Sequence, residues 1–420
     1  MKGWICQASD IEPDGLLTNL HEDTEKSNLK YDTYKSKSNI VFHSSKAFYM
    51  VKSGIKTQER HFYWLDLLRF MAALTVVFTH LRGVAFVEYG ALAATEKSFF
   101  VTAAFAITRI ANEAVIVFFV LSGFLVGGRA LDRILQGTFS PSDYAIDRFV
   151  RIMLPLLPAL ILTACIRLVI DGSFNVLILI GNILSLQGVF FPFFGDNYPL
   201  RSLSYEVWFY ILTYAIGIAS IKRSFYLPSV LLFILVAAIF TYLSSVYLFC
   251  WLIGAMMYVQ MPRGFSWKLL FFAFILFLYS IISIQIGYDS ISLSIKHLRS
   301  YFPSLNVSRL LLSLGMGMII QQVLFIKPTK FLWQKLDHMG TILAKSSYTL
   351  YLTHYPVMFL MIYLGLKRAE IVNLSTIGIY FGSILICLMV SWILYFLFEK
   401  HTGTVRKYIK RRMAISLKNK

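Results

Sequence analysis

The sequence predicts an all-α protein, a polytopic bundle of about 10 transmembrane helices with one further apolar segment that does not cross the membrane. Of its 420 residues, 57% are hydrophobic and only 15% are charged, which is too apolar for a water-soluble domain of this length. Apolar windows recur from Trp64 to Phe398, each of about 20 residues, enough to cross a hydrocarbon core of roughly 30 Å as a helix. The basic residues gather between alternate windows, as the positive-inside rule requires.

Ten of these windows are predicted to be spans. They lie near residues 64–81, 110–128, 152–170, 204–220, 225–242, 246–260, 269–287, 308–326, 347–366 and 374–398. The segment 174–194 is also apolar, but counting it as a full span would place the basic loops that follow it on the wrong side. Because prolines and glycines interrupt it and the residues just after it, we expect this segment to be re-entrant or interfacial.

The chain is expected to form one membrane domain, 62–400, between a flexible tail, 1–60, and a basic tail, 401–420, both in the cytoplasm. This arrangement predicts a multi-pass protein of the cell (inner) membrane, in direct contact with the lipid bilayer. A formal charge of +18 would suggest nucleic acid as the partner of a soluble protein, but here the positive-inside bias explains it, so no nucleic acid is expected. The four cysteines show no metal-ligand spacing, and no metal is expected.

Three ionisable residues occupy the first span. Asp66, Arg69 and His80 would each cost several kcal/mol in lipid unless they face protein or a water-filled path. Eleven residues advance a helix by about 16.5 Å and about three turns, so Arg69 and His80 share one stripe at opposite depths. Asp66 can pair with Arg69 across one helical turn. The alternative is that Arg69 snorkels to the inner interface and that His80 lies at the outer one.

Charged residues also mark the second and third spans. Glu113 lies near the outer end of the second span, where it faces either the interface or a cavity. Arg148 and Arg151 stand three residues apart at the start of the third span, a spacing suited to an anionic phosphate group. Their alternative role is to anchor the helix at the inner interface.

Two later segments combine hydroxyl groups with an ionisable residue. Ser204, Glu206 and Tyr210 lie at the start of the fourth span, where a serine can also serve simply to cap the helix. In the ninth span, His354 stands beside Pro356, and that proline frees a backbone carbonyl of the preceding turn. A simple kink is the alternative reading of this histidine and proline.

In this order, five blocks of the sequence resemble the acyltransferase 3 family of integral membrane O-acyltransferases, over roughly residues 62–400. The blocks are Arg69-x10-His80, the segment 118–124, Arg148-x2-Arg151-Ile152-x2-Pro155, Ser202-Leu203-Ser204-x-Glu206-x2-Phe209-Tyr210 and Ser347-Tyr348-x-Leu350-Tyr351-Leu352-x-His354-x-Pro356-Val357. There are two departures: Arg201 stands where the family often has tryptophan, and His401 where it often has proline.

The resemblance implies an enzyme that transfers an acyl group from acyl-CoA, usually acetyl-CoA, on the cytoplasmic side. The acceptor that it implies is a hydroxyl of an extracytoplasmic or lipid-linked glycan, which here would be a cell-envelope or exported polysaccharide. The reaction needs a base for the hydroxyl proton, a charge partner for the developing oxyanion and a hold on the CoA phosphates.

The candidate residues can be assigned to these needs. We expect His80 to be the general base or a transient acyl carrier, and Arg69, with Arg148 and Arg151, to orient the CoA end of the donor. Glu206 is expected to orient the acceptor. Four further residues are expected to contact the acceptor: Glu113, Ser204, Tyr210 and His354.

A transporter or flippase of a lipid-linked sugar is the alternative function. It would also have many helices, intramembrane charges and a re-entrant segment. The hydropathy pattern contains no visible inverted repeat, and a cluster of His, Arg and Glu suits group transfer better.

Overall fold

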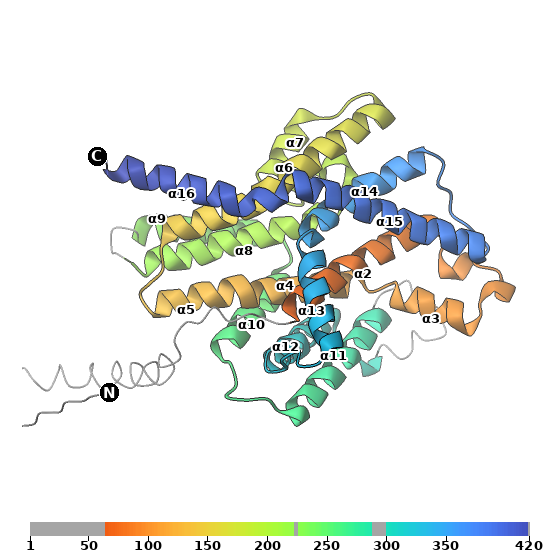
Figure 1. Cartoon of the computed structure of the whole chain (residues 1–420), viewed down its shortest axis with the longest axis horizontal. Helices are drawn as coiled ribbons and strands as arrows, with labels where there is room; N and C mark the ends of the chain where they lie inside the picture. The colour runs from red at the N-terminus through yellow and green to blue at the C-terminus, as the bar shows by residue number, and fades with distance from the viewer. Residues whose placement is uncertain (1–63, 222–225, 288–299, 419–420) are drawn as a thin grey trace, which may run out of the picture. The chain divides into compact units, whose positions relative to one another are not determined.

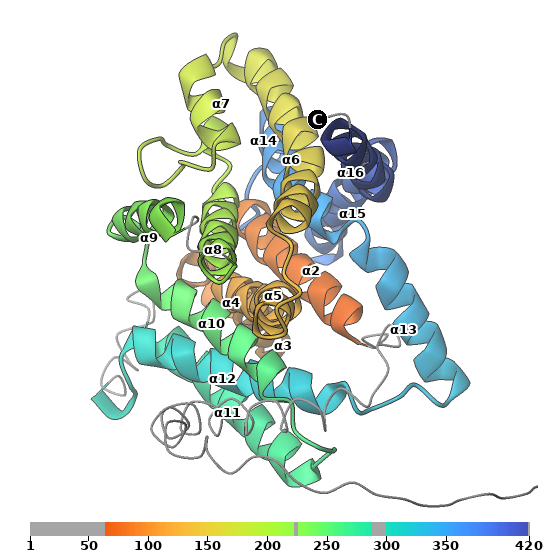
Figure 2. The same ribbon diagram turned by 90° about the vertical axis from the view of Figure 1, so that its left-hand side faces the viewer.

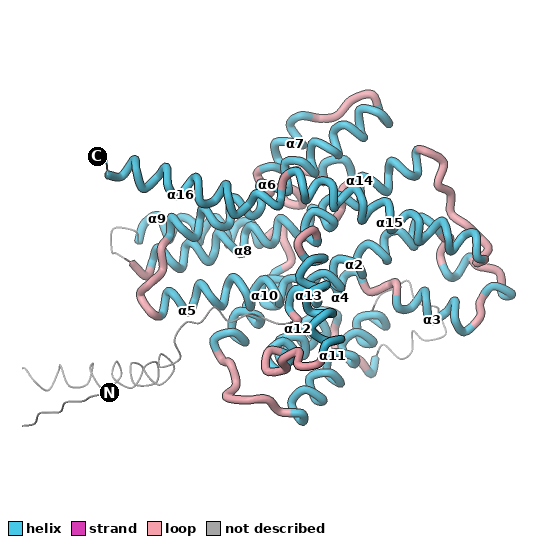
Figure 3. The backbone as a smooth tube through the Cα atoms, in the orientation of Figure 1, coloured by secondary structure: helices cyan, strands magenta, loops and turns pink. Residues whose placement is uncertain are grey.

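The computed structural model describes residues 64–221, 226–287 and 300–418. Within these ranges the chain is helical, and its only strand-like pairings are two isolated bridges, Phe86 with Ala369 and Gln187 with Phe191. Figure 3 shows helices joined by loops throughout the described part. The predicted all-α class is thereby confirmed, and the expected tail 1–60 lies outside the described residues.

Each of the ten predicted windows contains a helix. The main helices are α2 (Leu65–Ala85), α3 (Phe99–Ile107), α4 (Ala111–Ser122), α5 (Arg129–Leu135), α6 (Pro141–Asp171), α7 (Val176–Ile183), α8 (Leu200–Ala219), α9 (Tyr226–Phe240), α10 (Ser245–Val259), α11 (Trp267–Gly287), α12 (Leu305–Val323), α13 (Phe331–Ala344), α14 (Ser347–Tyr363), α15 (Leu374–Leu397) and α16 (Thr402–Lys418). Figure 1 labels them along the chain.

Five of the described helical stretches are long and apolar enough to cross a membrane. They are Leu65–Ala85, Phe99–Leu135, Pro141–Asp171, Trp267–Gly287 and Leu374–Met413. The helices α9 and α10 are apolar but shorter. Length and composition therefore support a membrane protein, while the count of about 10 spans stays a prediction.

The segment 174–194 contains only the eight-residue helix α7, which is about 12 Å long and too short to cross a bilayer. The chain then returns through a loop to the short helical turn η4 (Phe194–Asp196). The buried side chain of Asn182 donates to the carbonyl of Pro192 at 2.9 Å and accepts from the amide of Phe194 at 3.1 Å. These bonds satisfy two backbone groups, the Pro192 carbonyl and the Phe194 amide, in the non-helical stretch that the prolines and glycines indicated.

Glycine brings α4 and α10 into close contact. A Cβ atom added at Gly123 would lie 1.9 Å from the carbonyl oxygen of Trp251, and one added at Gly254 would lie 2.2 Å from that of Val120. Gly123 also begins a π-helical segment, η3 (Gly123–Gly128), that joins α4 to α5. Small residues thus let the two backbones meet, as they do between membrane helices generally.

The helices that carry the predicted site residues pack against one another. The helix α2 packs against α4, α13 and α14, while α6 contacts both α8 and α14. Figure 2 shows α8 between α6 and α4. The polar blocks, which are far apart in the sequence, therefore meet inside one bundle.

Candidate active site

Two cavities lie along these helices, and each contains one of the two ionisable residues that α2 presents on its stripe. The Arg69 cavity has a volume of about 140 Å³, and its polar lining is Arg69, Ser122, Arg148, Arg151, Ser202, Glu206, Tyr210, Ser347, Tyr348 and Tyr351. The His80 cavity has a volume of about 420 Å³, and its polar lining is His80, Asn112, Tyr198, Arg201, Ser202, Tyr205, Ser244, Tyr247, Arg309 and Tyr351.

The two cavities share a wall. Val115, Phe119, Ser202 and Tyr351 line both of them. The hydroxyl groups of Ser202 and Tyr351 are hydrogen-bonded at 2.6 Å. The cavities therefore lie at different depths along the same helices, separated by side chains.

The Arg69 cavity gathers three guanidinium groups. Arg69 pairs with Asp66 at 2.9 Å, as its spacing in the first span predicted. Arg148 lies over the ring of Tyr210, 5.5 Å from its centroid. Arg151 pairs at 2.7 Å with Glu399, which lies just beyond the end of α15.

Glu206 belongs to this cavity as well. Its Oε1 atom accepts hydrogen bonds from the hydroxyl of Tyr210 and from that of Ser122, the latter at 3.2 Å. The indole of Trp251 in turn donates to Ser122 at 3.3 Å. Glu206 lies four positions, about one helical turn, after Ser202 of the shared wall. It was expected to orient the acceptor, but it lines the cavity of the three arginines and not that of His80.

His80 is held by a second histidine. Its Nδ1 atom lies 2.9 Å from Nε2 of His354, and the Nδ1 atom of His354 lies 3.0 Å from the carbonyl oxygen of Leu350. A carbonyl only accepts, so His354 carries its proton on Nδ1, and its Nε2 accepts from Nδ1–H of His80. This chain of bonds leaves Nε2 of His80 as a basic nitrogen with a free lone pair.

His354 therefore lies behind His80, and neither cavity reaches it. Its side chain is fully buried, in contrast to the acceptor contact expected of it. The neighbouring proline acts as the sequence indicated, because the freed carbonyl of Leu352 accepts from the side-chain amide of Asn197 at 2.9 Å.

Two other expected acceptor contacts also lie away from the cavities. Ser204 is fully buried and donates to the carbonyl of Ser185 at 2.9 Å. Glu113 is buried and accepts from the amide of Gln285 at 2.6 Å. Of the four expected acceptor residues, Tyr210 lines the Arg69 cavity, and the other three line neither of the two cavities described.

The sequence reasoning did not single out several polar residues of the His80 cavity. They are Asn112, Tyr198, Tyr247 and Arg309. Arg309 had a usable signal, since it is a charged residue near the start of the apolar helix α12. The tyrosines had none, because aromatic residues are common at membrane interfaces.

Comparison with known proteins gives one match. The family model of acyltransferase 3, described as an acyltransferase domain, matches residues 62–396. No curated protein and no solved structure matches the chain.

Proposed function

The chain belongs to the acyltransferase 3 family, and from this membership we propose that it transfers an acyl group, acetyl in the simplest case, from acyl-CoA to a hydroxyl of a cell-envelope or exported glycan. In this reaction the thioester carbon–sulfur bond breaks and an ester carbon–oxygen bond forms. The hydroxyl proton leaves the acceptor, and CoA is released as its thiol.

Within the structure, the observation that best supports this proposal is the bond chain from His80 through His354 to Leu350. It fixes the ring orientation and the tautomer of His80, which are the two properties that a general base has to have in place. His80 lines the larger cavity, so its Nε2 atom is suited to take the proton of a hydroxyl group bound there.

We assign the Arg69 cavity to the donor. Three guanidinium groups line it together with the hydroxyl of Tyr210 and the carboxylate of Glu206. Guanidinium groups bind phosphate oxygens through paired hydrogen bonds. A volume of about 140 Å³ is below the roughly 300 Å³ at which pockets for drug-sized ligands begin. It therefore suits one end of an elongated donor such as acyl-CoA, with the remainder outside the cavity.

The orientation in the membrane follows from the charge pattern. The positive-inside bias supports a cell (inner) membrane orientation with both termini and the start of α2 on the cytoplasmic side. The Arg69 cavity then faces the side on which acyl-CoA is made, and the His80 cavity faces the opposite side. This arrangement suits an acceptor that is exported or lipid-linked.

The test replaces His80 and measures transfer of radiolabelled acetyl from acetyl-CoA into envelope glycan in isolated membranes. Removing a general base lowers kcat by about 10²- to 10⁴-fold, so His80→Ala is expected to retain at most about 1% of the activity. The matched control is His338→Ala, since His338 lies on α13 and lines neither cavity.

Wild-type transfer by a His80→Ala protein of normal membrane abundance would remove His80 from the mechanism. A wild-type protein that consumes no thioester would instead favour a transporter. Labelled protein recovered after incubation without glycan would identify His80 as an acyl carrier, with Nε2 attacking the thioester and CoA leaving before the hydroxyl arrives.

A further inference from the structure

The His80 cavity carries a positive charge that the transfer reaction does not require. Arg201 and Arg309 both line it, and its described lining contains no aspartate or glutamate. In the Arg69 cavity, by contrast, Glu206 is part of the lining, and Arg69 and Arg151 are paired with the carboxylates of Asp66 and Glu399. On the described part of the chain, Arg201 forms no ion pair. It lies in the first turn of α8, where the partial positive charge of the helix N-terminus adds to its own charge.

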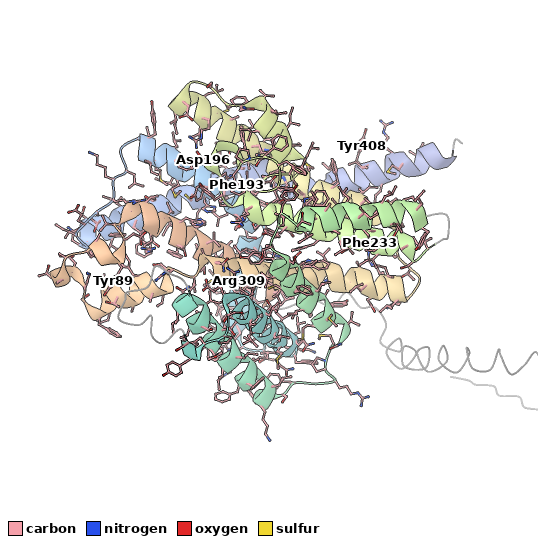
Figure 4. The ribbon with its side chains drawn as sticks, turned by 180° about the vertical axis from the view of Figure 1, so that it is seen from behind. Tyr89, Phe193, Asp196, Phe233, Arg309 and Tyr408 are labelled. Atoms are coloured by element: carbon pink, nitrogen blue, oxygen red, sulfur yellow. The ribbon has the colours of Figure 1, made fainter. Side chains whose placement is uncertain are left out.

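Arg309 is held in place with hydrogen-bonding capacity left over. Its Nη1 atom donates to the side chain of Asn306 at 3.1 Å, and its guanidinium carbon lies 5.4 Å from the ring centroid of Tyr247. Its buried Nε atom has no hydrogen-bond partner among the described residues. Tyr247 is fixed in turn, because its hydroxyl donates to Asn112 at 3.0 Å. Figure 4 labels Arg309 near the start of α12.

One acidic side chain interacts with Arg309 from outside the cavity. Glu113 is within electrostatic reach of Arg309, but its carboxylate accepts from Gln285 and lines neither cavity. A ligand in the His80 cavity would therefore meet two guanidinium groups and no opposing carboxylate from the described lining. An uncharged ligand would leave the buried Nε group of Arg309 without an acceptor, which is costly, whereas the exposed Arg201 side chain can remain hydrated until an anion binds.

We propose that the acceptor is an anionic saccharide and that Arg201 and Arg309 bind its oxyanion group beside His80. This inference rests on the proposed function and adds the substrate class. The oxyanion is the carboxylate of an acidic sugar or the phosphate of a sugar phosphate, since guanidinium groups bind both through paired bonds. A volume of about 420 Å³ falls within the range of roughly 300–1,000 Å³ that is typical of small-ligand sites, enough for a short saccharide segment.

The experiment removes the charge from the acceptor and from the protein separately. Envelope glycan is used untreated, after carbodiimide and borohydride reduction of its carboxyl groups, or after dephosphorylation with hydrofluoric acid. Wild type, Arg201→Gln and Arg309→Gln are compared in membranes for acetyl transfer into each preparation. Arg368→Gln is the matched control, because Arg368 is exposed and lines neither cavity.

We expect one of the two treatments to lower wild-type transfer by roughly 10-fold or more, the loss that follows when a hydrogen-bonded charge is removed. The treatment that lowers transfer identifies the oxyanion as a carboxylate or as a phosphate. Either cavity variant should raise the KM for untreated glycan by a similar factor and should no longer distinguish treated from untreated glycan. Equal wild-type transfer into all three preparations would overturn the inference and leave the proposed function intact.

A binding measurement separates this inference from failure of the proposed function. Purified protein is heated with tetragalacturonate or N-acetylglucosamine 1-phosphate, and with the uncharged counterparts of these two probes. An anionic probe should raise the thermal midpoint of the wild type and of Arg368→Gln, and not that of Arg201→Gln. Absence of stabilisation by both anionic probes would overturn the inference whether or not acyl transfer is detected.

Discussion

Replacing His354 tests whether the second histidine acts through the first. The side chain lies in neither cavity, yet its Nε2 atom accepts the hydrogen bond that orients His80. His354→Phe keeps a ring of similar shape and removes the acceptor. His354→Gln keeps an oxygen that reaches about as far as Nε2 and can accept from the same Nδ1–H group.

The magnitude follows from the single bond that is lost. A buried donor left without its acceptor costs about 1–3 kcal/mol, which corresponds to roughly 5- to 150-fold in rate if the loss is confined to the productive orientation of His80. We expect kcat of His354→Phe to fall by about 10- to 100-fold, and that of His354→Gln to fall by clearly less. The KM for acyl-CoA should stay unchanged, because His354 touches neither cavity.

The assay is acetyl transfer in membranes at saturating glycan, with acetyl-CoA titrated and protein abundance measured in parallel. The thermal midpoint of each purified variant serves as the control for folding, since His354 is fully buried. Wild-type kcat in a correctly inserted His354→Phe protein would refute the orienting role. Equal losses in the Phe and Gln variants would show that packing, and not the hydrogen bond, is what His354 contributes.

Three further outcomes are expected. Arg69→Lys should raise the KM for acyl-CoA at normal membrane abundance, because an ammonium cannot make two parallel bonds to phosphate; unchanged kinetics would return Arg69 to an anchoring role. Glu399→Gln should destabilise the purified protein by about 1–2 kcal/mol, less than the loss of a fully buried pair. The Arg151 side chain is 37% exposed, so water can solvate the charge that remains; an unaltered midpoint in a denaturant titration would contradict this. Gly254→Ala should abolish correctly folded protein in a fluorescence-detected size-exclusion assay, since the added Cβ meets backbone at 2.2 Å, whereas Gly382→Ala, with nothing within 4 Å, should behave as wild type.

Features set by one helix or one turn could be predicted from the sequence. The pair of Asp66 with Arg69, the shared stripe of Arg69 and His80 and the free carbonyl beside Pro356 all follow from helical geometry. In the structure, Asp66 and Arg69 form an ion pair at 2.9 Å. The carbonyl freed by Pro356, that of Leu352, accepts a 2.9 Å hydrogen bond from Asn197. Local geometry fixes them before any tertiary contact forms.

Helical geometry also predicts that two residues of one sequence block face different sides of α8. Ser204 and Glu206 are two positions apart on α8, so they point about 200° apart and cannot face one cavity. Glu206 and Tyr210 are four apart and do share a face, where the structure joins them by a hydrogen bond. The sequence contained this distinction, whereas the block resemblance did not.

The remaining features depend on which helix faces meet. His80 and His354 are 274 positions apart, and no periodicity within α2 or α14 indicates that their rings contact each other. The same holds for Arg309, which reaches the His80 cavity because α12 packs against α4 and α10. Tertiary packing selects one arrangement among many that each amphipathic pattern allows.

The shared wall indicates how donor and acceptor could meet within this fold under the proposed function. The backbones of α4 and α10 are in contact at Gly123 and Gly254, so separating these helices would disrupt tight packing along much of their length. The hydroxyl pair of Ser202 and Tyr351 is a single 2.6 Å hydrogen bond between side chains, and breaking such a bond costs only about 1 kcal/mol. If the proposed function holds, the Ser202–Tyr351 pair is therefore the part of the shared wall that a thioester end would displace most easily, since the other two residues that line both cavities, Val115 and Phe119, form no side-chain hydrogen bond that could open.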